Sequence, residues 1–290
     1  MTTHFHHPSD VLRFAHEAQD ACALICVTDI HGGAMRAKGA LMAVRADGVV
    51  AGYISNGCVD ADIIFQAKAA MEDGKIRRLK YGEGSPFKDI QLPCGGSIEL
   101  LVVPAPDENM VAEAVVKFAT RQSARLTVEG FEWRYAPKLR LRIAGRGAAV
   151  TALASQALQS GFEVHLQSPE ADMHNDLEVT KFDHLTSPAA PPPQNDDAWS
   201  AVILMFHDHD WETALLTQAL QSDAFYIGAM GSKRTHVLRC EALRDAAVSG
   251  DDIARIKGPI GLIPSMRDAN LLALSALAEI VKTAQDKGRL

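Results

Sequence analysis

The sequence lacks long apolar runs, a basic tract and closely paired cysteines. Apolar runs such as residues 201–206 are far shorter than the ~20 residues that span a bilayer. The chain does not open on a basic segment followed by an apolar one, so we expect neither a membrane span nor a secretory signal. With a net charge of −7 and no strongly basic tract, nucleic acid is not an expected partner. These absences together predict a cytoplasmic protein.

The five cysteines are scattered and odd in number, which is typical of a reducing compartment. No pair has the spacing of a zinc knuckle. Cys22 and Cys26 lie in an apolar, strand-like run and Cys240 in a helical pattern, so we expect these three in the core. A single cysteine is more often buried than reactive, but Cys58 and Cys94 stand beside glycines in predicted loops. A thiol in such a loop is open to chemistry.

A chain of 290 residues suits two domains. Residues 1–136 predict a mixed α/β domain that contains Cys58 and Cys94. Within it, Asp47-Gly48 separates two β-rich runs and predicts a hairpin with positive φ at both turn positions. Residues 125–135 predict one further strand.

The second half has a different pattern. Strands and helices alternate over residues 137–290, which predicts a Rossmann-like domain with a doubly wound parallel sheet. A proline-rich connector at residues 187–197 interrupts the alternation. The sequence therefore predicts an α/β protein with two differently built domains.

A first glycine turn, Gly145-Arg-Gly147, follows a predicted strand and opens a helix, as a Rossmann phosphate turn does. Helix N-terminal amides there attract a phosphate. Val150 stands where a small residue usually lies, and a strand-helix turn without a ligand is the alternative. The second strand ends at Gln167-Ser168, without the acidic residue that binds ribose in NAD enzymes, and Glu170 lies beyond a proline.

A second glycine turn, Gly231-Ser232-Lys233-Arg234, combines backbone amides, a hydroxyl and two cations at a helix start. This combination suits a phosphate or another oxyanion, and solvated charges on a glycine turn are the alternative.

A histidine-rich segment follows a buried strand that ends near residue 206. His207 and His209 are possible metal ligands. We favour the alternative in which they line a loop while Asp210 caps the next helix.

The thiols of the first domain are the remaining candidate ligand-binding groups. Cys58 follows Gly57 near an acidic helix start, where a helix N-terminus lowers a thiol pKa. Cys94 precedes Gly95 and Gly96, whose backbone is permissive. A thiolate in either loop can bind a soft metal or carry sulfur.

Segments in both halves of the chain together resemble the xanthine dehydrogenase accessory factors, the XdhC/CoxI family. In the first half they are GALMAV at 39–44, Asp47-Gly48, GYISNGCVD at 52–60 and LPCGG at 92–96, and in the second half IAGRG at 143–147, VILMFHDHD at 202–210, YIGAMGSKRT at 226–235 and IKGPIGL at 256–262. They occur in the family's order and cover nearly the whole chain. The chain departs from the family pattern at Asn56, Arg146, Val150, Ser168 and residues 263–265.

This resemblance implies a maturation chaperone without turnover of its own. Such a protein binds molybdenum cofactor (molybdopterin), supports its sulfuration with a cysteine desulfurase and inserts it into a xanthine dehydrogenase-type molybdenum hydroxylase. We expect Cys58 and Cys94 to contact the molybdenum or its sulfur ligand. The glycine turns and His207 would then hold the pterin phosphate or a nucleotide. We also expect a homodimer, because a closed interface shelters a labile cofactor.

Two other functions fit parts of the pattern. A Rossmann-like domain by itself suggests an NAD(P)-dependent oxidoreductase, against which the missing strand-tip acid argues. A nucleotide-binding regulatory module is the other alternative, and it would bind a nucleotide without affecting molybdenum enzymes.

Overall fold

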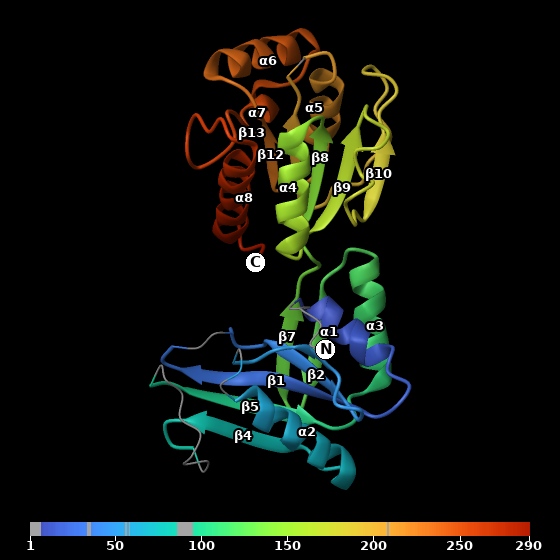
Figure 1. The fold of residues 1–290 in the computed structure, drawn as a ribbon, viewed down its shortest axis with the longest axis vertical. Helices are drawn as coiled ribbons and strands as arrows, with labels where there is room; N and C mark the ends of the chain where they lie inside the picture. Colours follow the sequence, from blue (N-terminus) through green and yellow to red (C-terminus); the bar gives the residue numbers. More distant parts are fainter. Residues whose placement is uncertain (1–6, 34–35, 56, 58, 86–94, 208) are drawn as a thin grey trace. The chain divides into compact units, whose positions relative to one another are not determined.

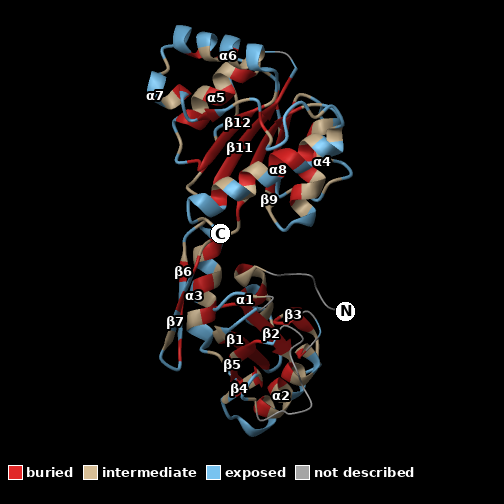
Figure 2. Ribbon diagram, turned by 90° about the vertical axis from the view of Figure 1, so that its left-hand side faces the viewer, coloured by how far each residue is buried: buried red, intermediate tan, exposed pale blue. Residues whose placement is uncertain are grey.

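The chain folds into two compact units, Met1–Pro137 and Lys138–Leu290, each with its own sheet and core (Figures 1 and 2). The computed structural model describes residues 7–33, 36–55, 57, 59–85, 95–207 and 209–290. No helix among these residues has both the length and the apolar character needed to cross a membrane.

The first unit is built on a five-stranded antiparallel sheet in the order β3-β2-β1-β5-β4. Its remaining strands, β6 and β7, pair only with each other. The elements are α1 (Pro8–His16), β1 (Cys22–His31), β2 (Leu41–Arg45), β3 (Val50–Gly52), α2 (Asp60–Asp73), β4 (Arg77–Gly82), β5 (Ser97–Val103), α3 (Glu108–Ala119), β6 (Ala124–Val128) and β7 (Phe131–Tyr135).

Both faces of this sheet are buried, and strand β1 shows why. Its side chains alternate between the two faces, as the period of two requires. Cys22, Leu24 and Cys26 enter a core shared with α1, α3 and the β6–β7 hairpin. Ala23 and Ile25 enter a separate core shared with α2. The buried positions of Cys22 and Cys26 confirm the expectation from sequence.

Two local predictions for this unit need correction. Residues 125–135 form not one strand but a hairpin, because Glu129 and Gly130 adopt positive φ values of 50° and 82° and reverse the chain. The Asp47-Gly48 hairpin is present, yet only Gly48 has a positive φ. The Gly48 amide bonds to the Arg45 carbonyl, which makes a three-residue loop ending in a left-handed glycine.

The second unit confirms the doubly wound parallel sheet. All six strands run parallel, in the order β10-β9-β8-β11-β12-β13, which is the 3-2-1-4-5-6 order of dinucleotide-binding folds. The elements are β8 (Arg140–Gly145), α4 (Ala148–Gln159), β9 (Glu163–Ser168), β10 (Lys181–His184), β11 (Ser200–Met205), α5 (Glu212–Leu220), β12 (Tyr226–Ala229), α6 (Lys233–Asp245), α7 (Gly250–Ile253), β13 (Ile256–Lys257) and α8 (Ala269–Asp286).

Helices cover both faces of this sheet (Figure 1). Helices α4 and α8 pack against each other and against one face, with Leu141 and Ile143 of β8 beneath them. Helix α5 and Leu243 of α6 cover the other face above Val202 and Leu204 of β11. Because β11 is buried along its whole length, it reads as an unbroken apolar run in the sequence.

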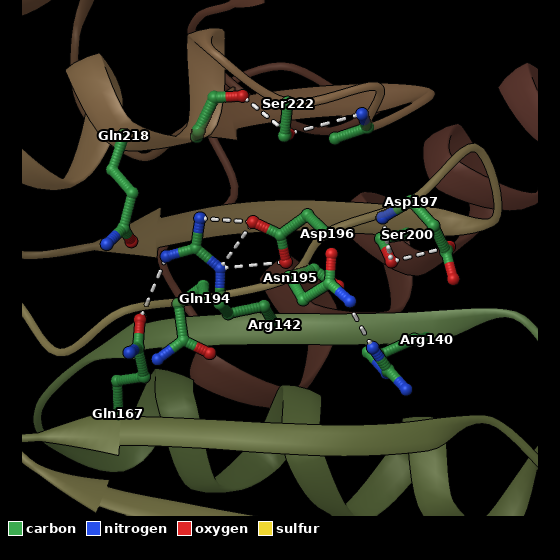
Figure 3. Close-up of polar contacts among 12 residues, drawn as sticks. Arg140, Arg142, Gln167, Gln194, Asn195, Asp196, Asp197, Ser200, Gln218 and Ser222 are labelled. Carbon is green, nitrogen blue, oxygen red and sulfur yellow. Dashed lines mark hydrogen bonds and ion pairs between the residues drawn. The ribbon is translucent and has the colours of Figure 1, made fainter. Parts of the chain in front are cut away.

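The crossover from β10 to β11 contains no helix. Instead the proline-rich connector at 187–197 returns over the sheet and is fixed there by Arg142 of β8 (Figure 3). The Arg142 side chain is fully buried and donates from Nε and Nη2 to Asp196, the latter at 2.6 Å, and from Nη1 to Gln167 of β9 at 3.0 Å. Gln167 in turn donates to Asp183 of β10. The guanidinium therefore links β8, β9 and the connector, and Gln167 extends the network to β10.

We predict that Arg142→Met lowers the free energy of unfolding of the second unit by about 3 kcal/mol, because it leaves the buried Asp196 carboxylate without its partner. Urea denaturation followed by circular dichroism measures the change. Arg142→Met combined with Asp196→Leu should recover part of the loss, since no unpaired charge remains.

Arg140→Met is the matched control on the same strand. Arg140 pairs with Glu163 at a partly exposed position, so its loss should cost about 1 kcal/mol or less. If both single variants lowered the free energy of unfolding equally, the buried pair of Arg142 and Asp196 would contribute no more than the partly exposed pair.

Candidate functional site

A pocket of about 750 Å³ opens at the carboxyl ends of the parallel strands in the second unit. Strands β8 and β11 are neighbours there although β9 and β10 lie between them in sequence, so the strand order reverses at this point. Open α/β sheets bind their ligands at such a point. Among the predicted residues, Gly147, His207 and Gly231 line this pocket, so three separate strand ends bring them together.

The β8–α4 turn supplies one wall, and its two glycines have different roles. A side chain at Gly145 would collide with the Met205 carbonyl oxygen and with Val150, so Gly145 allows β8, β11 and α4 to pack closely. Gly147 has φ 80° and ψ −176°, a conformation almost restricted to glycine, with open space around it. No side chain caps α4, and Gly147, Ala148 and Ala149 line the pocket at its first turn.

The tip of β9 supplies an acidic group that sequence reasoning placed in doubt. Ser168 ends the strand fully buried, and its hydroxyl accepts a hydrogen bond from the Glu170 amide at 3.1 Å. Glu170 lines the same pocket as Gly147. Strand β9 itself ends without an acid, as expected, and Glu170 lies at the pocket two residues beyond it.

Behind the Gly231 turn lies a buried ion pair between α5 and α6. Arg239 donates to both carboxylate oxygens of Glu212, at 3.0 and 2.8 Å, and also to the Met230 carbonyl at 2.7 Å. The Glu212 carboxylate also contacts His209 Nδ1 at 2.9 Å. Arg239 Nη1 is buried without a hydrogen-bond partner in the part of the chain that the structure describes.

Two predictions about helix starts have different outcomes. Helix α5 has Trp211 at its N-cap and no side-chain cap, so the prediction that Asp210 caps this helix was wrong. Ser232 does cap α6, because its hydroxyl accepts from the Thr235 amide. The neighbouring Lys233 and Arg234 are exposed and do not line the pocket, whereas Thr235 does.

The segment between β13 and α8 forms the remaining wall, which the sequence indicated only through the family-like residues 256–262 and the departure at 263–265. It contributes apolar groups such as Ile260 and Met266 and the guanidinium of Arg267. Two anchors on α8 hold it: Glu279 accepts from the Gly261 amide at 2.7 Å, and Ser275 accepts from the Ile263 amide at 2.8 Å. Most of this segment is neither helix nor strand, so only the folded structure shows that it lines the pocket.

In the first unit, a single carboxylate organises the loop before α2. Asp60 accepts hydrogen bonds from the amides of Ile54, Ser55 and Gly57, the last at 2.7 Å. Gly57 itself has φ 108°. Cys58, the proposed metal contact, lies outside the described residues.

The second glycine loop enters β5. Gly95 has φ 68°, and Gly96 packs so closely against the His31 carbonyl that no side chain fits. Cys94 lies outside the described residues. Strand β3 ends and strand β5 begins at the same end of the antiparallel sheet. Gly57 comes shortly after β3 and Gly95 shortly before β5, so both glycines are close in sequence to that end.

Metal binding by histidines finds no support among the residues that the structure describes, which contain no cluster of three or more His, Cys, Asp or Glu suited to a metal. His207 lines the pocket and His209 is held by Glu212. Asp208 between them lies outside the described residues.

Comparisons with known proteins agree with this architecture. A model of the XdhC Rossmann domain matches residues 141–280, and a model of the XdhC and CoxI family matches residues 15–82. The molybdenum cofactor insertion chaperone PaoD of Escherichia coli (strain K12) is 35% identical, over 93% of this chain and 86% of its own. This chain belongs to the XdhC and CoxI family.

Two further relatives of this XdhC and CoxI family member are more distant. The uncharacterized protein YqeB of Escherichia coli (strain K12) is 23% identical, over 90% of this chain and 43% of its own. A crystal structure described as a xanthine dehydrogenase from Bacillus halodurans superposes with a TM-score of 0.80, at 19% identity, over 97% of this chain and 96% of that one. The last similarity shows the fold.

We predict that Cys22 and Cys26 resist alkylation in the folded protein. Burial raises the pKa of Cys22 to about 11 and that of Cys26 to about 12. Only thiolates react, and at pH 8 these values leave roughly one thousandth and one ten-thousandth of each thiol ionised.

Iodoacetamide labelling at pH 8, read by peptide mass spectrometry, tests this expectation. Both cysteines should react fully after denaturation in urea, which serves as the control. Rapid labelling of either one in the native protein would show that the first sheet opens readily.

Proposed function

We propose that this protein binds molybdenum cofactor and inserts it into a molybdenum enzyme of the xanthine dehydrogenase type. The observation that carries the proposal is the 35% identity to a molybdenum cofactor insertion chaperone across nearly the whole of both chains. In this role the cofactor is cargo, and the protein acts as a maturation chaperone without turnover of its own.

The pocket of the second unit suits a phosphate-bearing ligand with a planar ring system. The Gly147 turn and the uncapped start of α4 offer backbone amides to a phosphate. Arg146 and Arg267 line the same pocket and add positive charge, while Phe206 and Ile260 add apolar surface. We therefore assign the pterin phosphate, or a nucleotide, to this pocket.

The thiols of the first unit suit the molybdenum itself. Cys58 and Cys94 are sequence neighbours of Gly57 and Gly95. Gly57 comes shortly after β3 and Gly95 shortly before β5, at strand termini that lie at one end of the antiparallel sheet. Thiolates are soft ligands that bind transition metals and accept sulfur. We propose that these two cysteines contact the molybdenum or its sulfur ligand.

Three further features complete the proposal. A cysteine desulfurase supplies the sulfur that the cofactor carries, and the chain acts as a homodimer that closes around its cargo. The protein works in the cytoplasm, where the reducing conditions keep its cysteines as thiols.

We expect protein purified anaerobically from a molybdenum-replete host to contain molybdenum and molybdopterin in equal amounts. Cys58→Ser with Cys94→Ser should lower the bound molybdenum about tenfold or more, because a neutral hydroxyl is a poor ligand for a soft metal. Metal analysis and fluorescence of the oxidised pterin measure the two contents.

Cys240→Ser is the matched control, because Cys240 is a half-buried thiol of the second unit. It should leave both contents unchanged, and only the double variant should fail to activate the apo-form of a molybdenum hydroxylase. Wild-type protein that stays free of pterin even after incubation with the cofactor would refute the chaperone role.

A further inference from the structure

A group of exposed apolar side chains lies on helix α8 and on the segment that precedes it. Leu271 and Leu274 of α8, and Leu262 and Ile263 of the preceding segment, are each between 50% and 58% exposed. We propose that these four residues, together with Ala278, form the apolar patch through which two copies of the chain dimerise. The proposal rests on the homodimer of the proposed function and adds the surface that forms it.

The four large side chains form one continuous surface. The Ile263 amide donates to the Ser275 hydroxyl of α8 at 2.8 Å, and the Leu262 amide donates to the Ser275 carbonyl at 3.2 Å. These bonds hold the segment beside the helix, next to Leu274 and one turn from Leu271. Figure 2 shows exposed stretches, in pale blue, recurring along α8. Elsewhere in the described ranges, exposed large apolar side chains occur singly or as one adjacent pair in sequence. An apolar group of this size marks a contact surface.

The exposed face of α8 has the spacing of a helix-packing surface. Leu271, Leu274 and Ala278 follow one another at intervals of three and four residues, and the half-buried Val281 continues the row. Residues with this spacing share one side of a helix. The core of the second unit is formed by other residues of α8, such as Ile280. The exposed row is therefore available to a partner.

The row is complementary to itself, which identifies the partner as a second copy. Its amino-terminal half carries Leu271 and Leu274, and its carboxyl-terminal half carries the smaller Ala278 and Val281. When two copies of α8 pack antiparallel about a two-fold axis, Leu274 lies over the partner's Ala278 and Leu271 over the partner's Val281. Large side chains facing small ones allow close helix packing. A parallel pair would set leucine against leucine and leave a gap beside the alanines.

The charges at the two ends of α8 favour the same arrangement. Arg267 precedes the helix and Asp286 ends it, and both residues are exposed. Antiparallel packing brings Arg267 toward the partner's Asp286, and it sets each helix start beside a helix end, where the helix dipoles attract. A parallel pair would instead bring Lys282 toward the partner's Lys282. Opposite charges therefore select a second copy in the antiparallel orientation.

A dimer formed through the patch also affects the pocket of the second unit. Ile263 belongs to the patch and lines the pocket, and Arg267 at the edge of the patch lines it as well. A second copy seated on the patch therefore covers one wall of the pocket. This cover shields a bound cofactor from water on that side.

Analytical ultracentrifugation of the full chain, freed of any cofactor, tests the proposal. The wild type should sediment as a dimer at micromolar concentration. Leu274→Glu should weaken the dimer about tenfold or more, because the new carboxylate would be buried in the interface without a partner. Circular dichroism should show an unchanged fold, since Leu274 is more than half exposed in the single chain.

Val116→Glu is the matched control, because Val116 is 61% exposed on α3 of the first unit. It should leave the dimer unchanged. Arg267→Asp should weaken the dimer, because it sets two carboxylates against each other. Arg267→Asp combined with Asp286→Arg should restore much of the affinity, since the exchanged charges attract again.

Three outcomes would overturn the proposal. They are a monomeric wild type, a dimer that Leu274→Glu leaves equally tight, and a charge-exchanged double variant as weak as Arg267→Asp alone. A monomer in which Leu274→Glu abolishes activation of an apo-hydroxylase would assign the patch to that enzyme instead. The molybdenum and molybdopterin contents of the wild type are measured separately. A wild type that carries the cofactor as a monomer, or as a dimer formed through another surface, would retain the chaperone role and lose this proposal.

Discussion

The buried pair of Arg142 and Asp196 is the interaction on which the second unit depends. A doubly wound sheet needs a crossover at the point where its strand order reverses, and here that crossover has no helix to bury. The guanidinium replaces the missing apolar contact with directed hydrogen bonds to the connector and to β9. Arg142 lies three residues before Gly145, and Gln167 three residues before Glu170, so the same network fixes the strand ends that form the pocket.

Much of the second unit could be predicted from its sequence because β8, β11 and β12 are almost wholly buried, and β8 and β12 lead into glycine turns. The Gly145 and Gly231 turns, the connector and the doubly wound sheet were all visible in this way. The wall at 258–268 was indicated only by its resemblance to the family, because it has no periodic pattern and is held by Glu279 and Ser275 from a helix that follows it. Glu170 could not be placed at the pocket from the sequence, which shows the proline before it but not the hydrogen bond from its amide to the buried Ser168 hydroxyl.

The first unit shows a different limit of sequence reasoning. The apolar run from Cys22 to Val27 in β1 indicates a strand buried on both faces, but it does not reveal which elements cover each face. No strand was predicted at 77–82, because β4 is an edge strand in which Arg77, Arg78 and Lys80 interrupt any apolar pattern. The hairpin at 124–135 was taken as one strand because Glu129, a residue that seldom adopts positive φ, forms its turn with Gly130. Cysteine positions in the core were predictable, because their neighbours are apolar.

The proline-rich connector also affects the protein before it folds. Residues 191–193 are three consecutive prolines, whose ring-fixed φ angles restrict the unfolded chain as well as the folded one. An ordered segment of this kind loses less conformational entropy on folding than a flexible loop of equal length. A few anchors, such as Asp196 on Arg142 and the Pro192 carbonyl on Gln218, are then sufficient to hold it. Replacing these prolines with alanine would therefore weaken the second unit through the greater freedom of its denatured state, even though the hydrogen bonds that hold the connector remain.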